Sequence, residues 1–426
     1  MKIIEKLIII TLVVSSFLPH LWGIALIKIN IDSIIQWLAY RVNALFVGLL
    51  LIIAIITVFL LMSKNKKTIV PNFHFNVLDL LVLILFFGIG SFAAIIGLLK
   101  GNPIYYVIGD TYIYFTFGIL YFLAAYFVRR EGIFKIIDFS VYFIFIFVII
   151  ETVYRLTGYF LTKSFPVGGI VYYLLPFVFF LSKYQYASYR SKKILLALII
   201  SMVAIMLTTY RTLAISMVFI IILLPWLTLH LKRSYLKIAG LFIFFILIAF
   251  VLNSTNVLPI FGRYDLSYYY HSLFDPNWEG RRDLRVIETT SAINTMREDT
   301  LNYFWGMGQG AIVEMTKGET YKDVYVYGEE GGTFEGTKVH SIHFTPTSVF
   351  FRTGILGLTF FFLFLLFTWL FLYKKFSRSA FPQNRLYSEI VLLFFTALIF
   401  YSFSRYGIVN DLVLATFLGL IRNPNL

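Results

Sequence analysis

Cysteine is absent from this 426-residue chain. The absence excludes disulfide bonds, thiolate nucleophiles and cysteine-ligated metal sites. Charged residues are also scarce, at 14% of the sequence, against 59% hydrophobic residues and a mean hydropathy of +0.83. A soluble globular protein has a lower apolar fraction. The sequence therefore predicts an all-α polytopic membrane protein rather than two or three soluble domains.

Uninterrupted apolar runs indicate where the chain crosses the membrane. A helix needs about 20 apolar residues to cross about 30 Å of hydrocarbon. We expect about twelve such helices, the first of them an uncleaved span because no small-x-small cleavage pattern follows it. The predicted spans are 7–27, 44–62, 78–99, 112–128, 136–154, 167–182, 194–210, 212–230, 238–253, 347–372, 388–404 and 407–421.

Charge is distributed unevenly along the chain. The formal net charge is +14, yet residues 254–346 hold 13 of the 22 acidic residues, 8 basic ones and three of the six histidines. The remaining basic residues gather in alternate short loops, which is the positive-inside pattern of membrane proteins and not a nucleic-acid footprint. We therefore expect both termini to be cytoplasmic and the long loop to be external. Helices 1–9 occupy residues 1–253, the long external loop occupies 254–346, and helices 10–12 occupy 347–426.

The long loop contains one segment with a helical pattern. Residues 281–299 place Leu284, Ile287, Ser291 and Met296 roughly on one side and Arg281, Arg285 and Glu288 on another. We therefore predict a helix in the loop. Its charged side is either a substrate-binding face or a solvated one.

Three short motifs surround this loop. Arg211 lies at the external end of a tight hairpin, and a Gly-x-Gly-x-Gly turn covers residues 306–310. His343 comes eleven residues before Gly354, which opens a new apolar segment. Over residues 195–375 this arrangement resembles the O-antigen polymerase and O-antigen ligase superfamily.

The histidine motif departs from that family in one respect. Family members carry a His-Asn or His-Ser pair, whereas His343 is followed by Phe344. His340 is the alternative family histidine. The spacing to Gly354 favours His343.

The resemblance implies a C-type glycosyltransferase fold in the bacterial inner membrane, with the long loop in the periplasm. It also implies an external site for an undecaprenyl-diphosphate-linked oligosaccharide donor and acceptor. The catalytic candidates are His343 and His340, because an imidazole can accept a proton near neutral pH. Arginine binds phosphate oxygens through its planar fork, so we expect a diphosphate site without metal or cofactor. Its candidate residues are Arg211, Arg281, Arg282, Arg285 and Arg405. Expected partners also include membrane lipids, a chain-length regulator and a flippase.

Each of these residues has a structural alternative. An arginine at the end of a span is often a lipid anchor, and His340-x-x-His343 lacks the third protein ligand of a zinc site. Asp411 and Glu151 are predicted inside spans, where carboxylates are costly and often functional; Asp411 could instead pair with Arg405. The favoured function is polymerisation of surface-polysaccharide repeat units. Ligation to lipid A–core and flipping of lipid-linked oligosaccharide are the alternatives.

Overall fold

The computed structural model describes most of the chain, with gaps. The described ranges are 75–128, 130–162, 173–186, 188–207, 211–227, 284–315, 320–321, 332–333, 338–340, 342, 344–402 and 411–423, with isolated positions 6, 48, 52, 56 and 240. Apart from four of these isolated positions, the predicted spans 7–27, 44–62 and 238–253 lie outside the described residues.

The described residues are almost entirely helical. The helices are α3 (Val77–Val82), the π-helix η1 (Leu83–Ile89), α4 (Gly90–Leu99), α5 (Ile104–Phe127), α6 (Arg130–Thr162), α7 (Leu174–Gln185), α8 (Lys192–Leu207), α9 (Arg211–Leu227), α12 (Leu284–Met296), α13 (Leu301–Trp305), α14 (Thr345–Arg378), α15 (Pro382–Ser402) and α16 (Leu412–Arg422). Two antiparallel strand pairs join β1 (Val313–Glu314) to β4 (Lys338–Val339) and β2 (Thr320–Tyr321) to β3 (Gly332–Thr333).

The length and composition of these helices agree with a membrane protein. Five helical segments of the described chain are long and apolar enough to cross a bilayer: Val77–Leu99, Ile104–Phe127, Gly132–Val153, Thr345–Arg378 and Pro382–Ser402. The predicted all-α membrane fold is thus confirmed, while the number of twelve spans stays a prediction.

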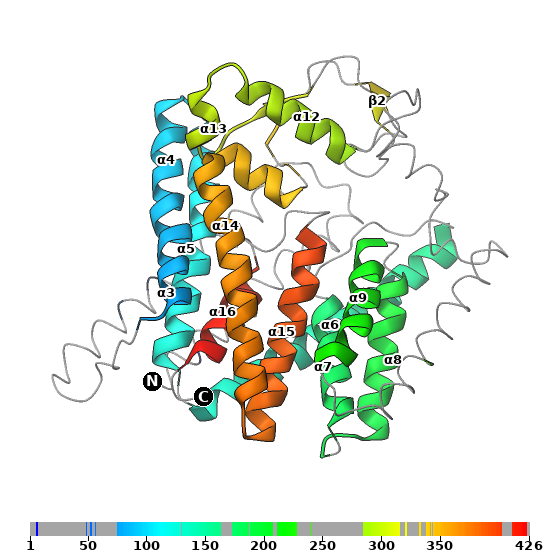
Figure 1. Cartoon of the computed structure of the whole chain (residues 1–426). Helices are drawn as coiled ribbons and strands as arrows, with labels where there is room; N and C mark the ends of the chain where they lie inside the picture. Colours follow the sequence, from blue (N-terminus) through cyan, green and yellow to red (C-terminus); the bar gives the residue numbers. More distant parts are fainter. Residues whose placement is uncertain are drawn as a thin grey trace.

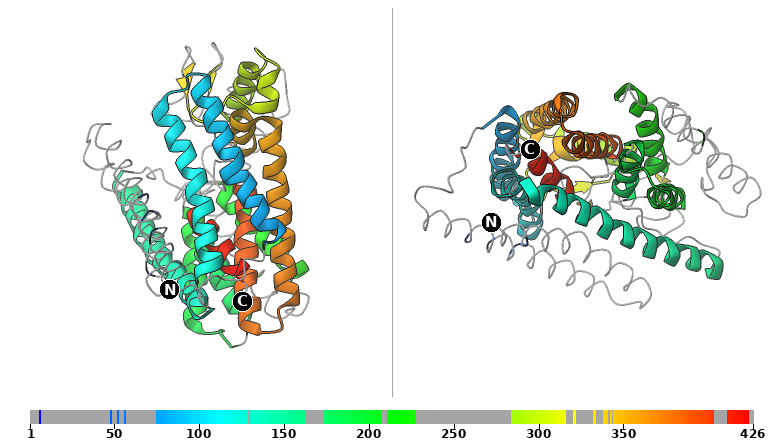
Figure 2. Two further views of the ribbon diagram at one scale, coloured as in Figure 1. Left: turned by 90° about the vertical axis from the view of Figure 1, so that its left-hand side faces the viewer. Right: turned by 90° about the horizontal axis from the view of Figure 1, so that it is seen from below.

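The helices form a bundle with three parts (Figures 1 and 2). The continuous α3–η1–α4 segment, α5 and α14 make one side, and α7, α8 and α9 make the other. Helices α15 and α16 lie between them, with α16 packed along α5 and α15 along α14, α9 and α7. Helix α6 runs obliquely along the rear side of the bundle, opposite to α14, as both views of Figure 2 show.

Aromatic packing joins the first side of the bundle. The Phe86 ring stacks on Phe117 at 4.1 Å between centroids, and Phe364 meets Phe86 edge-on at 5.5 Å. All three rings are buried. Offset and edge-on pairs of this kind contribute about 0.5–1.5 kcal/mol beyond the burial of their area. They fix η1, α5 and α14 against one another.

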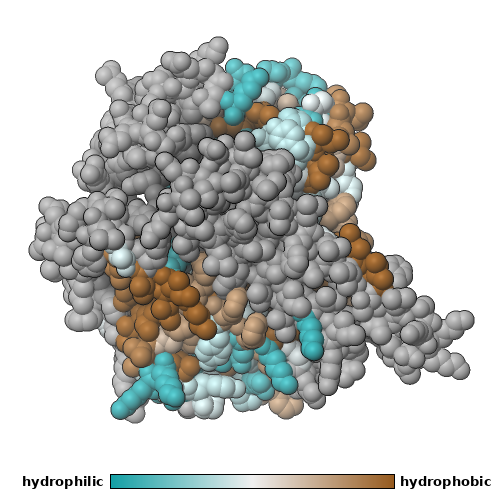
Figure 3. All heavy atoms as spheres, turned by 180° about the vertical axis from the view of Figure 1, so that it is seen from behind, coloured by the Kyte–Doolittle hydropathy of each residue, from teal (hydrophilic) through white to brown (hydrophobic). Residues whose placement is uncertain are grey.

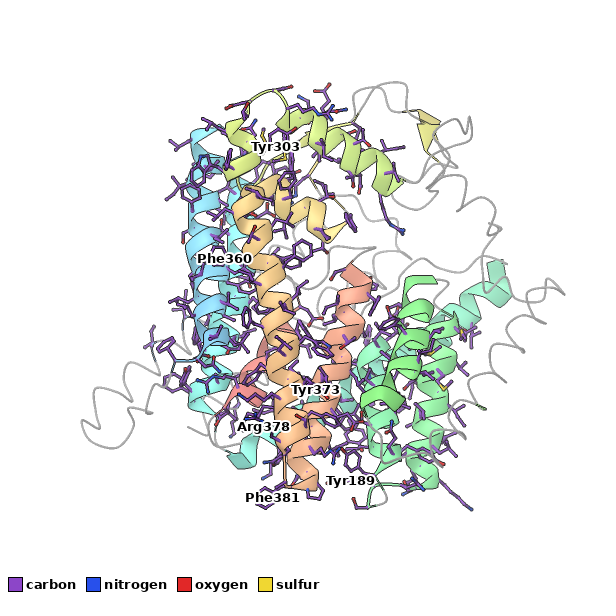
Figure 4. The ribbon with its side chains drawn as sticks, viewed as in Figure 1. Tyr189, Tyr303, Phe360, Tyr373, Arg378 and Phe381 are labelled. Atoms are coloured by element: carbon purple, nitrogen blue, oxygen red, sulfur yellow. The ribbon has the colours of Figure 1, made fainter. Side chains whose placement is uncertain are left out.

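The outer surface of the bundle suits a lipid environment. Ile95, Ile108, Ile146 and Leu366 each expose more than half of their accessible area, although all four lie within candidate spans. In the rear view of Figure 3, hydrophilic side chains line the lower edge of the molecule directly below an apolar area. Figure 4 shows Tyr303 near the upper end and Arg378 near the lower end of the bundle.

Helix α12 confirms the helix predicted within 281–299 and packs over the upper end of α14 (Figure 1). Ile287, Ser291 and Met296 are buried, as their spacing predicts. Glu288 is buried as well, with 0% of its area exposed, so this residue is not part of a solvated face. Helix α12 packs against both β1 and α14, so more than one of its sides is covered, whereas a solvated helix would bury only one.

Candidate functional site

The Gly-x-Gly-x-Gly segment forms a turn between α4, α5 and α14. Gly306, Gly308 and Gly310 have φ angles of 76°, 84° and 75°, a region that glycine enters without steric cost. The Met307 N–H donates to Phe351 O (2.7 Å), and the Gln309 N–H donates to Ala93 O (2.8 Å). A segment distant in sequence is thus hydrogen-bonded to two membrane helices.

Two polar residues after α4 hold this turn in place. The Lys100 ammonium donates to Asn302 Oδ1 and to Gly306 O. The Asn102 amide donates to Met307 O (2.9 Å) and Gln309 O (3.0 Å). Burial lowers the pKa of Lys100, and the Asp299 carboxylate acts in the opposite direction.

The end of this turn leads to a buried carboxylate on α5. Asp110 Oδ2 accepts the Gly310 N–H at 2.8 Å. The same oxygen lies 3.0 Å from Arg352 Nε and 3.2 Å from His340 Nε2. Only 6% of the Asp110 side chain is exposed. One carboxylate therefore joins α5, the glycine turn, α14 and the segment after β4.

Arg352 is the cation of this cluster. Its side chain is 4% exposed, and it donates to Ser348 Oγ (2.5 Å) and to His340 O (3.0 Å) in addition to its ion pair with Asp110. Two residues later α14 kinks at Gly354, whose φ is 66°. A Cβ at this position would collide with the Phe304 carbonyl. The apolar segment that opens at Gly354 continues a helix that begins at Thr345, close to the predicted start of the span 347–372.

His340 occupies the solvent-facing side of the cluster. It follows β4, where Val339 pairs with Val313 and both are buried. The imidazole stacks on Tyr106 with 4.0 Å between ring centroids and 8° between planes. Its side chain is 21% exposed. The ring is therefore held on one side by Tyr106 and at Nε2 by Asp110, yet it still reaches solvent.

This geometry fixes the chemistry that the imidazole can perform. A carboxylate acceptor next to Nε2 favours the tautomer with its proton on Nε2. Nδ1 then keeps a lone pair and can accept a proton, while Asp110 stabilises the imidazolium that forms. Arg352 offsets the buried charge of Asp110. A His–Asp pair of this kind is suited to general base catalysis.

The predicted site residues have different outcomes. His340 belongs to the cluster. His343, Arg281, Arg282 and Arg405 lie outside the described residues. Arg211 is the first residue of α9, and Arg285 is half-buried on α12.

The two predicted intramembrane carboxylates are both buried. Glu151 is 5% exposed on α6, and Asp411 is 2% exposed. Asp411 is not inside its span: it is the N-cap of α16, and its Oδ1 accepts the Leu414 N–H at 2.8 Å. This contact satisfies a free amide at the start of the helix.

Asp110 and Arg352 were not predicted as site residues. Asp110 lies in an apolar stretch, where a carboxylate is a functional candidate by default. The sequence alone could therefore have identified it as a candidate site residue. Arg352 lies inside the predicted span 347–372, so the same rule applied to it, although an arginine near the end of a span is often only a lipid anchor.

Among the described residues, no group of three or more histidine, aspartate or glutamate side chains is placed to hold a metal ion. A comparison with protein-family models finds no match, and a search of curated proteins finds no significant one.

Proposed function

We propose that this chain is a membrane glycosyltransferase that polymerises undecaprenyl-diphosphate-linked oligosaccharide repeat units into O-antigen or a similar surface polysaccharide. The reaction would take place on the external face of the bacterial inner membrane. The observation that supports it most directly is the His340–Asp110 pair, which lies where the long loop meets the membrane helices. A lipid-linked donor and a polar acceptor would meet at such a boundary.

In the proposed reaction, an acceptor hydroxyl attacks the anomeric carbon of the donor. His340 Nδ1 takes the hydroxyl proton as the new C–O bond forms. The bond between the anomeric carbon and the diphosphate oxygen breaks, and undecaprenyl diphosphate leaves with the bonding electrons. Tyr106 and Asp110 keep the imidazole oriented.

The diphosphate requires cations near the leaving oxygen. Arg352 is occupied by Asp110, Ser348 and His340 O, which supports a positioning role for it. The candidates for the diphosphate remain Arg211, Arg281, Arg282, Arg285 and Arg405. Arg211 begins a helix and Arg285 lies on the helix that covers α14, which makes these two the first to test.

The test compares His340→Gln and His343→Ala at matched membrane levels in a strain that lacks the chromosomal gene. We expect His340→Gln to abolish long polysaccharide and leave core capped by a single repeat. Full-length polymer from both variants would contradict the assignment. Accumulation of unattached lipid-linked polymer would indicate a ligase, and accumulation of intracellular repeat units would indicate a flippase.

Transfer activity should persist when a chelator is added, since no step of the proposed reaction is assigned to a metal.

A further inference from the structure

A second polar cluster lies inside the bundle, at the end opposite to His340. It is formed by Ser182, Gln185 and Tyr186 at the end of α7 and by Ser388 and Glu389 on α15, two helices that pack together. The lower ends of these helices are visible in Figure 1, and Tyr189 marks the same region in Figure 4. Nothing in the proposed transfer reaction uses this cluster.

The cluster is buried and only partly hydrogen-bonded. Glu389 is 0% exposed; its Oε2 accepts the Tyr186 hydroxyl at 2.9 Å, and the Ser182 hydroxyl lies close to the same carboxylate. In the described part of the chain, Glu389 Oε1, the Ser388 hydroxyl and both amide atoms of Gln185 have no hydrogen-bond partner. Buried polar atoms are rarely left in this state without a ligand or solvent.

Within the described part of the chain, the charge of Glu389 has no direct counter-ion. None of the ion pairs found among the described residues includes it. Lys183, the residue after Ser182, is bound to Asp138 at 3.0 Å. Arg385, one helical turn before Glu389, acts on the carboxylate electrostatically but forms no ion pair with it. A buried carboxylate without an ion-pair partner costs several kcal/mol, so a bound cation or a proton would stabilise this site.

The unpartnered atoms indicate what kind of cation fits. Carboxylate, hydroxyl and amide oxygens are the ligands of hard cations. A divalent ion is disfavoured because Glu389 is the one carboxylate of the cluster. A proton would neutralise Glu389 but would leave the Gln185 amide oxygen and the Ser388 hydroxyl without a new contact. A sodium-sized ion can contact oxygens of several side chains at once.

We propose that the Glu389 cluster binds one small monovalent cation, with Glu389 Oε1, Ser182 Oγ and Gln185 Oε1 as ligands and Ser388 Oγ beside them. The ion holds α7 against α15. Its binding requires no glycan substrate.

The experiment uses the purified full-length chain in detergent, without substrate. Sodium chloride replaces choline chloride at constant ionic strength while the unfolding temperature is followed by tryptophan fluorescence. An ion that binds the folded chain raises this temperature with the logarithm of its concentration. We expect such a rise in the natural protein and its loss in Glu389→Gln. Equilibrium dialysis with radioactive sodium should give one ion per chain.

Ser182→Ala and Ser201→Ala form a matched pair. Both serines are fully buried, but Ser201 donates to Ala197 O within its own helix at 2.9 Å. We expect Ser182→Ala to weaken sodium binding about tenfold, the effect of losing about 1.4 kcal/mol, and Ser201→Ala to leave it unchanged.

Equal sodium responses in the two variants would overturn the proposal even if Glu389→Gln fails to fold. A stability that changes with pH but not with sodium would overturn it too, since a proton would then neutralise Glu389.

Discussion

Asp110 on α5 and Arg352 on α14 form an ion pair of 3.0 Å in which both side chains are almost fully buried. The same two groups hold His340, Asp110 through the Nε2 atom and Arg352 through the backbone carbonyl. The proposed base is thus fixed by a charge pair between two membrane helices. Changes to that pair should therefore affect both stability and transfer.

The Asp110–Arg352 pair can be tested with a double-mutant cycle. Removing one partner leaves a buried charge, so Asp110→Asn and Arg352→Met should each lower the free energy of unfolding by about 3–5 kcal/mol. The double variant should lose less than the sum of the two single losses, because no charge is then left unpaired. Reversible denaturation in detergent measures all four proteins. Strict additivity would show that the two charges do not interact.

Tyr106 is expected to affect transfer through the orientation of His340. Tyr106→Phe keeps a flat ring against the imidazole and should keep the natural rate. Tyr106→Ala removes a stacking interaction of about 1 kcal/mol, which corresponds to about a fivefold fall in the rate of polymer formation. The rate is measured on membranes with matched protein levels. Equal rates in Tyr106→Ala and Tyr106→Phe would rule out this role for the ring.

Much of the fold could be predicted from apolar run lengths, because a span is a local property of the sequence. The spans predicted at 78–99 and 136–154 coincide with helical segments of the structure. The glycine turn was also predictable, since alternating glycines favour positive φ angles, and three such angles are present.

The partners of charged residues were less predictable, because they depend on contacts between distant segments. Arg422 follows the last predicted span and has the pattern of a cytoplasmic charge, but its guanidinium is buried against Asp79 at 2.7 Å. A carboxylate in an apolar run, such as Asp110, indicates a candidate site residue. Only the folded chain shows that Asp110 contacts His340 and Arg352. Residue spacing predicts the face of one helix; it does not predict which other helix covers that face.

The glycine turn offers a prediction with a close control. A Cβ at Gly308 would collide with the Gly97 backbone, and the φ of 84° disfavours any side chain. Gly308→Ala should therefore lower the free energy of unfolding by about 2 kcal/mol or more. Gly109 on α5 has no atom near the position of an added Cβ, so Gly109→Ala should stabilise by up to about 1 kcal/mol. Similar losses in both variants would show that the turn is not tightly packed.

The C-terminal helix is attached to the rest of the bundle through Asp79. This fully buried carboxylate accepts from the Tyr121 hydroxyl (2.7 Å), the Tyr126 hydroxyl (2.9 Å), the Asn76 N–H (2.9 Å) and Arg422 Nη2 (2.7 Å). The cluster therefore joins α3, α5 and α16 at one charge. Arg422 supplies the only cation in direct contact with Asp79 among the described residues.

Loss of the Arg422 cation should cost more than loss of one hydroxyl in this cluster. Arg422→Met leaves Asp79 charged and buried, and we expect a loss of about 3–5 kcal/mol in the free energy of unfolding. Tyr126→Phe removes one of several donors to an ionised group, so the expected loss is about 1.5–3 kcal/mol at most. Denaturation in detergent measures both, and proteolysis near the C-terminus reports whether α16 detaches first. If Arg422→Met is no less stable than Tyr126→Phe, then the ion pair is not what holds α16 to α3 and α5.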